Sequence, residues 1–332
     1  MSTKKYIERI EIILSTMDPV FDCIISKIIP NFMVKCQRRK NSRIGKTYMK
    51  EIVFLNGEYL EADKAKVSIF DRGYLFGDGV YEVVPVVNYK VLDKEPFLER
   101  LSRSLGEIEL KWPYPKEYLL EMIDELIKRN NLKEGGVYMQ VTRGVAPRNF
   151  SYPADISTTC TAFAFEKEVI NNPKAKTGVK VVTVPDIRWK RRDIKSISLL
   201  GQCIAKEEAS QKGAYEGWMV EDGFVTEGTS SSAYIVKDGV VITRPLSNSI
   251  LPGIRRKLLL SLSEKHNIKV EQRLFSVEEA LDADEAFLSS ATTFVLPIIE
   301  IDGKKIGDGK PGEFAIKMRK MYIDSALKIA GV

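Results

Sequence analysis

The stretch from Thr177 to Gly228 limits most strongly how this chain can fold. It begins with a β-branched run, residues 179–184, which favours a strand because branched side chains pack well on a pleated surface. Residues 199–212 are then predicted to form a helix that ends before Gly213, a residue suited to a helix C-terminus. The Asp222-Gly223 pair that follows indicates a hairpin. This stretch is therefore predicted to contain both strand and helix.

One lysine in this stretch lies among apolar residues. Lys195 is flanked by Ile194 and Ile197, and a lysine is rarely held in such a setting unless it is paired. A lysine removed from water gives up its proton easily, which frees the amine to form a Schiff base with an aldehyde or ketone. The alternative is an ordinary lysine with its ammonium in water. The local sequence alone favours that second interpretation.

Length and composition exclude several classes of protein. The chain has 332 residues, so two domains are expected, and no apolar run approaches the roughly 20 residues of a membrane helix. Four scattered cysteines without C-x-x-C spacing argue against a disulfide framework or a zinc site and fit a reducing cytoplasm. Because the single histidine, His266, lies in a polar stretch, Ser-His and Cys-His catalysis and His-ligated metal are excluded.

The formal net charge of +6 comes entirely from residues 1–48. This segment has ten Lys or Arg and four Asp or Glu, so the remaining chain is neutral and no nucleic-acid partner is expected for it. The four acidic residues argue against a transit peptide. We interpret residues 1–48 as a leader of unknown role and Met49 as a plausible true start. A regulatory tail, translated upstream DNA and a role at a nucleic acid or membrane surface stay open for the leader.

Residues 80–87 are predicted to form a strand after an earlier hairpin at Asn56-Gly57. Because strand side chains alternate, Tyr81, Val83 and Pro85 share one face. Proline also indicates an edge or irregular strand. Three glycines before this strand indicate turns and close backbone approach. They are Gly73, Gly77 and Gly79.

The linker between the two domains is predicted at residues 171–178. This segment is polar and contains Pro173 and Gly178, as linkers often do. A small N-terminal domain of residues 49–170 would precede it. A larger C-terminal domain of residues 179–332 would follow.

Five blocks of sequence, in this order, resemble the class IV aminotransferases, which are pyridoxal phosphate enzymes of fold type IV. The blocks are DRGYLFGDGVYEVV, RGVAPRNFSYP, DIKSISLLGQCIAKEEA, VTEGTSSSAY and LPGIRR. The first two resemble the D-amino acid transaminase branch. The resemblance extends from about Met49 to the C-terminal helix. It implies a two-domain α/β (α+β) fold, with a small N-terminal domain and a larger cofactor-binding domain.

The resemblance also implies a role for each matching residue. Lys195 is the implied catalytic residue, which binds pyridoxal 5'-phosphate as a Schiff base and moves a proton. Glu227 would bond to the pyridine nitrogen and keep it protonated, which makes the ring an electron sink. Ile254 and Arg255 would bind phosphate through backbone N–H groups at a helix start. The other implied cofactor-binding residues are Arg100, Ser231, Ser290 and Ala291.

Substrate binding is implied for four residues, Tyr81, Val83, Arg148 and Phe150. Arg148 matches the arginine that binds the substrate carboxylate, for which a planar bidentate donor is well suited. The sequence departs from the family at four positions. They are Pro85 (usually basic), Phe150 (usually histidine), Ser232 (usually asparagine) and Ala291 (usually threonine).

The predicted function is transamination of a D-amino acid of the D-alanine class with 2-oxoglutarate, giving a 2-oxo acid and D-glutamate. The family implies a homodimer in which the partner chain completes the site. We expect larger apolar D-substrates to compete with D-alanine, because Phe150 and Pro85 add apolar surface. An L-branched-chain transaminase or an aminodeoxychorismate lyase of the same fold is the alternative. A non-catalytic cofactor-binding paralogue, suggested by Ser232 and Ala291, is the alternative of another class.

Overall fold

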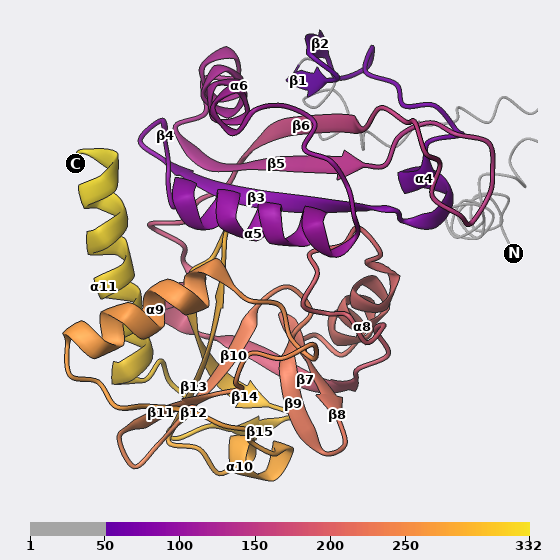
Figure 1. Cartoon of the computed structure of the whole chain (residues 1–332). Helices are drawn as coiled ribbons and strands as arrows, with labels where there is room; N and C mark the ends of the chain where they lie inside the picture. The colour runs from indigo at the N-terminus through magenta and orange to yellow at the C-terminus, as the bar shows by residue number, and fades with distance from the viewer. Residues whose placement is uncertain (1–50) are drawn as a thin grey trace, which may run out of the picture. The chain divides into compact units, whose positions relative to one another are not determined.

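The structure is a computed structural model and describes residues 51–332. It contains a six-stranded sheet built before residue 167 and a nine-stranded sheet built after residue 178, in the upper and lower halves of Figure 1. Helices pack on both sheets, so the predicted α/β class is confirmed. The predicted leader, residues 1–48, lies outside the described residues.

The first sheet is antiparallel, with strand order β2-β1-β6-β5-β3-β4. Its strands are β1 (Ile52–Leu55), β2 (Glu58–Glu61), β3 (Gly79–Val87), β4 (Lys90–Val91), β5 (Glu134–Thr142) and β6 (Thr159–Glu166). The hairpin predicted at Asn56-Gly57 joins β1 to β2, and both turn residues have positive φ angles, of 50° and 99°. This conformation explains the asparagine–glycine pair.

Pro85 lies within β3, where a proline is tolerated for a local reason. β4 pairs only with Val86 and Val87, so no described strand pairs with β3 at Pro85 on that side. The Pro85 carbonyl accepts a hydrogen bond from Leu92 on the β4 side, at 3.0 Å. Its nitrogen faces the same side, so no bond to β5 is lost.

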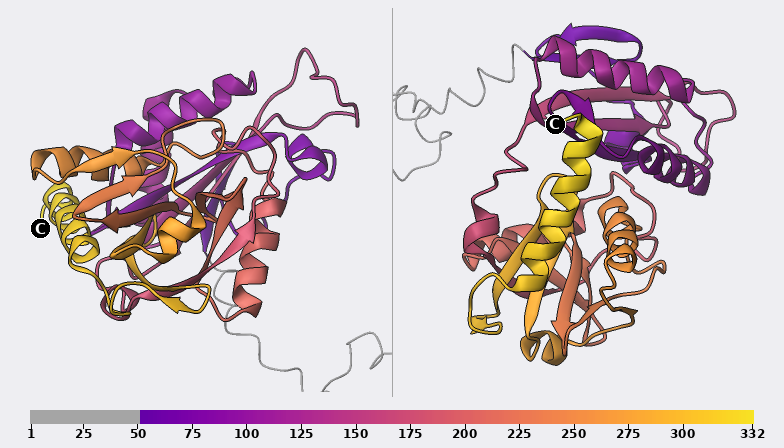
Figure 2. Two further views of the ribbon diagram at one scale, coloured as in Figure 1. Left: turned by 90° about the horizontal axis from the view of Figure 1, so that it is seen from below. Right: turned by 90° about the vertical axis from the view of Figure 1, so that its left-hand side faces the viewer.

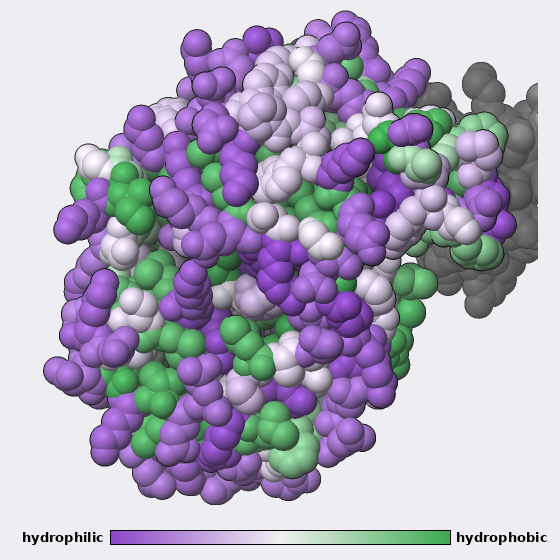
Figure 3. Space-filling view, viewed as in Figure 1, coloured by the Kyte–Doolittle hydropathy of each residue, from purple (hydrophilic) through white to green (hydrophobic). Residues whose placement is uncertain are grey.

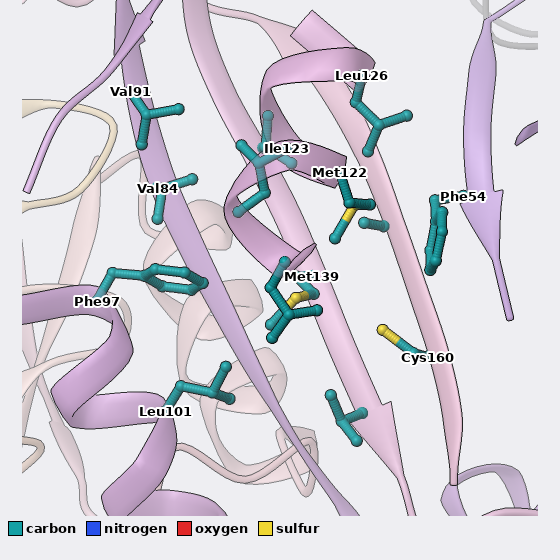
Figure 4. Packing of buried hydrophobic residues seen from close by; sticks show 14 of the residues in the cluster. Phe54, Val84, Val91, Phe97, Leu101, Met122, Ile123, Leu126, Met139 and Cys160 are labelled. Atoms are coloured by element: carbon teal, nitrogen blue, oxygen red, sulfur yellow. The ribbon is translucent and has the colours of Figure 1, made fainter. Parts of the chain in front are cut away.

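Helices α5 (Lys94–Glu107) and α6 (Lys116–Arg129) pack against this sheet. α5 presents an apolar stripe to the sheet, with Leu101 and Leu105 buried. Figure 4 shows Phe97 and Leu101 of α5 directed toward the strand residues Val84 and Met139. Each such side chain contributes about 1.5–3 kcal/mol when fully buried. This core therefore holds β3 and β5 firmly.

The second sheet has strand order β12-β11-β10-β13-β14-β7-β8-β9, and β15 pairs with β14. Its strands are β7 (Val179–Pro185), β8 (Glu216–Glu221), β9 (Phe224–Gly228), β10 (Ser232–Lys237), β11 (Val240–Thr243), β12 (Val270–Gln272), β13 (Glu285–Ser290), β14 (Phe294–Ile301) and β15 (Lys304–Lys305). β7 runs parallel to both of its neighbours, β8 and β14. The hairpin predicted at Asp222-Gly223 joins β8 to β9, with φ angles of 54° and 80°.

Five helices accompany the second sheet. They are α7 (Lys174–Thr177), α8 (Leu200–Gln211), α9 (Ile254–Lys265), α10 (Val277–Leu281) and α11 (Glu313–Ala330). The helix predicted over residues 199–212 is α8, one residue shorter at each end. α7 lies in the predicted linker and was not expected there. None of the helices within residues 51–332 is long and apolar enough to cross a membrane.

Residues 169–170, in the segment that connects the two sheets, form hydrogen bonds through both their N–H and their carbonyl groups. Glu134 accepts hydrogen bonds from the N–H groups of Val169 (2.5 Å) and Ile170 (2.7 Å). Arg319 on α11 donates to the carbonyls of the same two residues and to two carbonyls at the start of β14. The first sheet and helix α11 therefore both hold this connection.

Helix α11 reaches both halves of residues 51–332, as Figure 2 shows on the right. Its Tyr322 hydroxyl donates to Asp93, before α5, at 3.0 Å and accepts from Arg255 on α9 at 2.5 Å. Arg255 and Asp93 also form an ion pair. These buried contacts join the two halves, and the predicted domain limits, 49–170 and 179–332, stay a prediction.

Candidate active site

A cavity of about 310 Å³ lies between the two sheets. Most of the sequence-predicted site residues line it, although they come from segments far apart in the chain. They are Tyr81, Val83, Arg100, Lys195, Glu227, Ser231, Ile254, Arg255, Ser290 and Ala291. The fold therefore brings together the residues of all the predicted blocks except the one that contains Arg148.

The segment that carries Lys195 pairs with the start of β3. Tyr81 donates its N–H to the Lys195 carbonyl (3.0 Å), and Ile197 donates to the Gly79 carbonyl (3.1 Å). A Cβ atom on Gly79 would lie 2.6 Å from the Val141 carbonyl oxygen and 3.0 Å from the Ile197 side chain. The close backbone approach predicted for this glycine is therefore confirmed.

The Lys195 side chain is half-buried at the wall of the cavity. Its Nζ lies 4.1 Å from the centre of the Tyr81 ring, a distance at which the ring face attracts an ammonium group. Its neighbour Ile194 is buried in the core of the first sheet. The apolar setting predicted for this lysine is present on that side.

Glu227, near the end of β9, is a buried carboxylate in the same cavity. It accepts hydrogen bonds from Arg188 Nη1 (2.5 Å) and from the Leu251 N–H (3.1 and 3.2 Å to its two oxygens). Burial raises the pKa of Glu227 above its ordinary value, although the Arg188 charge opposes the shift. Because a carboxylate offers about four acceptor positions, Glu227 can accept a further N–H from a bound ring.

Arg188 joins Glu227 to a second buried carboxylate, Asp186. The Arg188 guanidinium donates to both Asp186 oxygens, at 2.9 and 2.7 Å, and Thr226 also donates to Asp186 at 2.7 Å. Burial alone would raise the pKa of Asp186, but the hydrogen bonds and charge of Arg188 outweigh it and hold the pKa below its usual range. This pair was not predicted from the sequence, although the charges in DIRWKRRD were its signal.

Hydrogen-bond donors gather where α9 begins. Gly253, before α9, provides no side-chain cap, so the first N–H groups of the helix lack a capping partner of that kind. The Ser231 hydroxyl is buried and has no hydrogen-bond partner among the described residues. The Ser290 hydroxyl bonds to Thr293 at 2.7 Å. A helix start with nearby hydroxyls is suited to an anion.

Arg100 lines the cavity but is also an ion-pair partner. Its Nε and Nη2 donate to the two oxygens of Glu82 at 2.8 and 2.7 Å, and Nη1 donates to the Pro252 carbonyl at 3.3 Å. Glu82 is buried and was not identified from the sequence. Since Arg255 is paired with Asp93 in a similar way, both arginines at this side of the cavity have a carboxylate partner.

The first sheet contributes an aromatic wall to the cavity. The Tyr138 ring stacks between Tyr81, at a centroid distance of 5.5 Å, and Phe163, at 4.9 Å. Phe165 and Val83 complete this wall. Burial raises the pKa of Tyr138 far above its ordinary value, and the neighbouring Tyr81 adds to the shift. The alternating pattern of β6, TCTAFAFE, was the signal for Phe163 and Phe165.

Arg148 and Phe150 do not line the cavity of their own chain. They lie on residues 144–153, here called the Arg148 loop, and Phe150 is 77% exposed. The Arg148 guanidinium lies 5.4 Å from the ring centres of both Phe76 and Phe150. The apolar surface expected from Phe150 and Pro85 at the substrate end is therefore absent from this cavity. Phe150 contacts Arg148 instead, and Pro85 is buried in the sheet.

Two comparisons of sequence agree with this geometry. Residues 79–301 match the family model described as amino-transferase class IV. The chain is 42% identical to the D-alanine aminotransferase of Staphylococcus haemolyticus, over 82% of this chain and 98% of the relative. It is 40% identical to the D-alanine aminotransferase of Bacillus licheniformis, over 83% of this chain and 97% of the relative.

Solved structures have the same fold. The branched-chain amino acid aminotransferase of Escherichia coli aligns with a TM-score of 0.78 at 23% identity, over 83% of this chain and 94% of that one. The branched-chain aminotransferase of Thermoproteus uzoniensis, solved with norvaline, aligns with a TM-score of 0.73 at 27% identity, over 85% of this chain and 95% of that one. The predicted family is confirmed: this chain belongs to the class IV aminotransferases.

Proposed function

We propose that this enzyme transfers the amino group of a D-amino acid of the D-alanine class to 2-oxoglutarate. One observation carries the proposal. Lys195 and Glu227 face one cavity in a chain that is 40–42% identical to D-alanine aminotransferases over most of its length. The products are a 2-oxo acid and D-glutamate.

Pyridoxal 5'-phosphate is the proposed cofactor, and the residues present fit it. The uncapped start of α9 and the unpartnered Ser231 hydroxyl suit its phosphate. Ile254 and Arg255 would use their backbone amides, Ser290 its hydroxyl and Ala291 its amide. Arg100 would add an N–H group that Glu82 and Pro252 do not use, since a guanidinium has five donors.

When bound, the cofactor supplies an electron sink for the substrate Cα. Glu227 holds a proton at the pyridine nitrogen, and Arg188 keeps the Glu227 carboxylate in place. Lys195 would hold the cofactor through Nζ, and its free amine would accept the proton of the substrate Cα at Nζ. Tyr81 and Val83 line the cavity and would exclude water from the bound substrate.

We also propose that the enzyme is a homodimer. Arg148 lies outside its own cavity, and exposed apolar side chains surround its loop and helices α4 (Arg72–Phe76) and α8. They include Ile69, Phe70, Tyr74, Phe150, Leu200 and Ile204, and Figure 3 shows green side chains over α4 and α8 along the right-hand edge. A second copy would cover this surface. Arg148 of the partner subunit would then bind the substrate carboxylate.

The aromatic wall favours substrates with larger apolar side chains in addition to D-alanine. Tyr138, Phe163 and Phe165 offer surface that a methyl group cannot fill, and buried apolar area contributes about 25 cal/mol per Å².

The free thiols of Cys160 and Cys203 support a reducing compartment, and we propose the cytoplasm.

The test is a panel of D- and L-amino acids with 2-oxoglutarate as acceptor. We expect turnover of D-alanine and of larger apolar D-amino acids, with D-glutamate as the product. Faster turnover of L-leucine or L-valine than of every D-isomer would favour the branched-chain alternative. A cofactor-loaded protein without turnover of any amino acid would favour the non-catalytic paralogue.

A further inference from the structure

Arg72, the first residue of α4, is buried beside the Arg148 loop, with 2% of its surface exposed. Its Nε donates to Asp78 at 2.7 Å, and its guanidinium lies 4.8 Å from the centre of the Phe76 ring. Neither Arg72 nor Asp78 lines the cavity. This buried ion pair therefore has no part in the proposed chemistry of the cavity.

The two remaining nitrogens of Arg72 hold the Arg148 loop. Nη1 donates to the carbonyls of Asn149 and, at 3.4 Å, of Ser151, and Nη2 donates to the carbonyl of Phe150 at 3.3 Å. Three consecutive carbonyls directly after Arg148 therefore bind one guanidinium. This arrangement needs the planar fork of arginine, because an ammonium is a point donor.

Asp78 connects a second arginine to the same loop. Arg143 Nε donates to Asp78 at 2.8 Å, and the Tyr152 ring lies 3.5 Å from the Arg143 guanidinium carbon. The other nitrogens of Arg143 donate to the carbonyls of Ile108 and Glu109, outside the loop. The base of the loop is therefore a buried network, although its tip is exposed.

We propose that Arg72 is a positioning residue for Arg148. Its hydrogen bonds fix the loop backbone, so that the Arg148 guanidinium is presented at one position between the Phe76 and Phe150 rings. Fixing the loop before substrate binds removes the entropy cost of ordering it during binding. The inference rests on the proposed role of Arg148 in binding the substrate carboxylate across the dimer.

The test compares Arg72→Lys and Arg148→Met, alone and combined, in the full-length enzyme. Arg72→Lys keeps the charge but cannot bind three carbonyls in one plane. We expect it to raise the inhibition constant of 4-methylvalerate, a carboxylate without an amino group, and the KM for D-alanine about tenfold (about 1.4 kcal/mol). We expect kcat to change by about twofold or less. Backbone amides of residues 148–153 should exchange hydrogen faster.

The matched control is Arg143→Lys, which removes a guanidinium from the same Asp78 but leaves the loop carbonyls bound. Its inhibition constant should rise by less than about twofold, the size of a weak contact. Asp78→Asn leaves Arg72 in place with a weaker anchor. Asp78→Asn should raise the inhibition constant of 4-methylvalerate, but by less than Arg72→Lys does. It replaces Arg72→Lys in the test if that variant does not fold.

The outcomes separate this inference from the proposed function. If Arg148→Met leaves the inhibition constant unchanged, the proposed role of Arg148 is wrong and the inference falls with it. If Arg148→Met weakens inhibition but Arg72→Lys does not, the inference alone is overturned. An effect of Arg72→Lys that persists undiminished in the double variant would also overturn it, because Arg72 would then act elsewhere.

Discussion

Two regions of this chain direct their functional side chains differently: Lys195 and Glu227 point inward, and the side chains of the Arg148 loop point outward. Lys195 and Glu227 face a cavity of their own chain and are held by strands and buried partners. Arg148 and Phe150 extend into solvent from a loop whose base is buried. This difference supports the proposal that one chain supplies Lys195 and Glu227 to its cavity, while the substrate carboxylate is bound by Arg148 of a second copy.

The largest expected effect is a loss of turnover, caused by a substitution inside the cavity. Lys195→Ala should lower turnover at least about a thousandfold, because both the covalent attachment and the proton transfer are lost. Borohydride reduction of the cofactor-loaded enzyme, followed by peptide mapping, should find the pyridoxyl group on Lys195. Lys190→Ala, a change at a nearby exposed lysine, is the control. Labelling of another lysine would show that the assignment is wrong.

A smaller effect is expected from the buried charges behind Glu227. Asp186→Asn should lower the free energy of unfolding by about 3 kcal/mol at pH 7, because it leaves Arg188 with one carboxylate partner fewer. Urea denaturation measures the loss. Asp308→Asn, at an exposed ion pair with Lys310, should have almost no effect.

The same variant has a pH dependence with a defined sign. The folded pKa of Asp186 is lowered, so the ionised carboxylate stabilises the fold fully above the unfolded pKa of about 3.9. That stabilisation is lost as the pH falls through the lower, folded pKa. The difference between wild type and Asp186→Asn should therefore be constant above about pH 5 and shrink below about pH 4. A difference that grows on acidification would contradict the lowered pKa.

In the Arg148 loop, a substitution at Phe150 should change the preference among substrates more than it lowers activity. Phe150→His adds a polar group beside Arg148 and removes an apolar ring, so kcat/KM for D-alanine relative to D-leucine should rise about threefold, which corresponds to roughly 0.7 kcal/mol. Tyr74→His changes another exposed aromatic residue of this surface and should leave the ratio unchanged. An unchanged ratio in Phe150→His would show that Phe150 does not affect substrate choice.

The smallest effect is expected outside both regions. A chain that begins at Met49 should keep the stability and turnover of the full chain, because the resemblance to the family begins near that residue. Thermal unfolding and steady-state kinetics of the two forms test this. An insoluble or inactive shorter chain would refute it.

Local signals in the sequence predicted much of the fold. Asn56-Gly57 and Asp222-Gly223 mark hairpins because their backbone angles are costly for other residues. The helix over residues 199–212 has a clear end at Gly213, where φ is 71°. Helix α7 was missed because its four residues, KAKT, have no apolar periodicity.

The candidate site was predicted less completely, for a physical reason. Lys195 and Glu227 lie in blocks of sequence that resemble the class IV family, whereas the positions of Arg188 and Glu82 are explained only by partners distant in the chain. Arg100 pairs with Glu82 across 18 positions, and Arg188 pairs with Glu227 across 39. A charged residue that is buried by such a partner looks like any surface charge in the sequence.

The hydrogen bonds at residues 169–170 restrain the joint between the two sheets. Glu134 and Arg319 hold the N–H and carbonyl groups of the same two residues, so the two sheets cannot rotate about this joint without breaking four bonds. A hinge motion at this joint would therefore cost those four bonds. We expect the distance between the aromatic wall and Lys195 to change little when a substrate binds, so the proposed preference among side chains would reflect how well each one fills a space of nearly constant size.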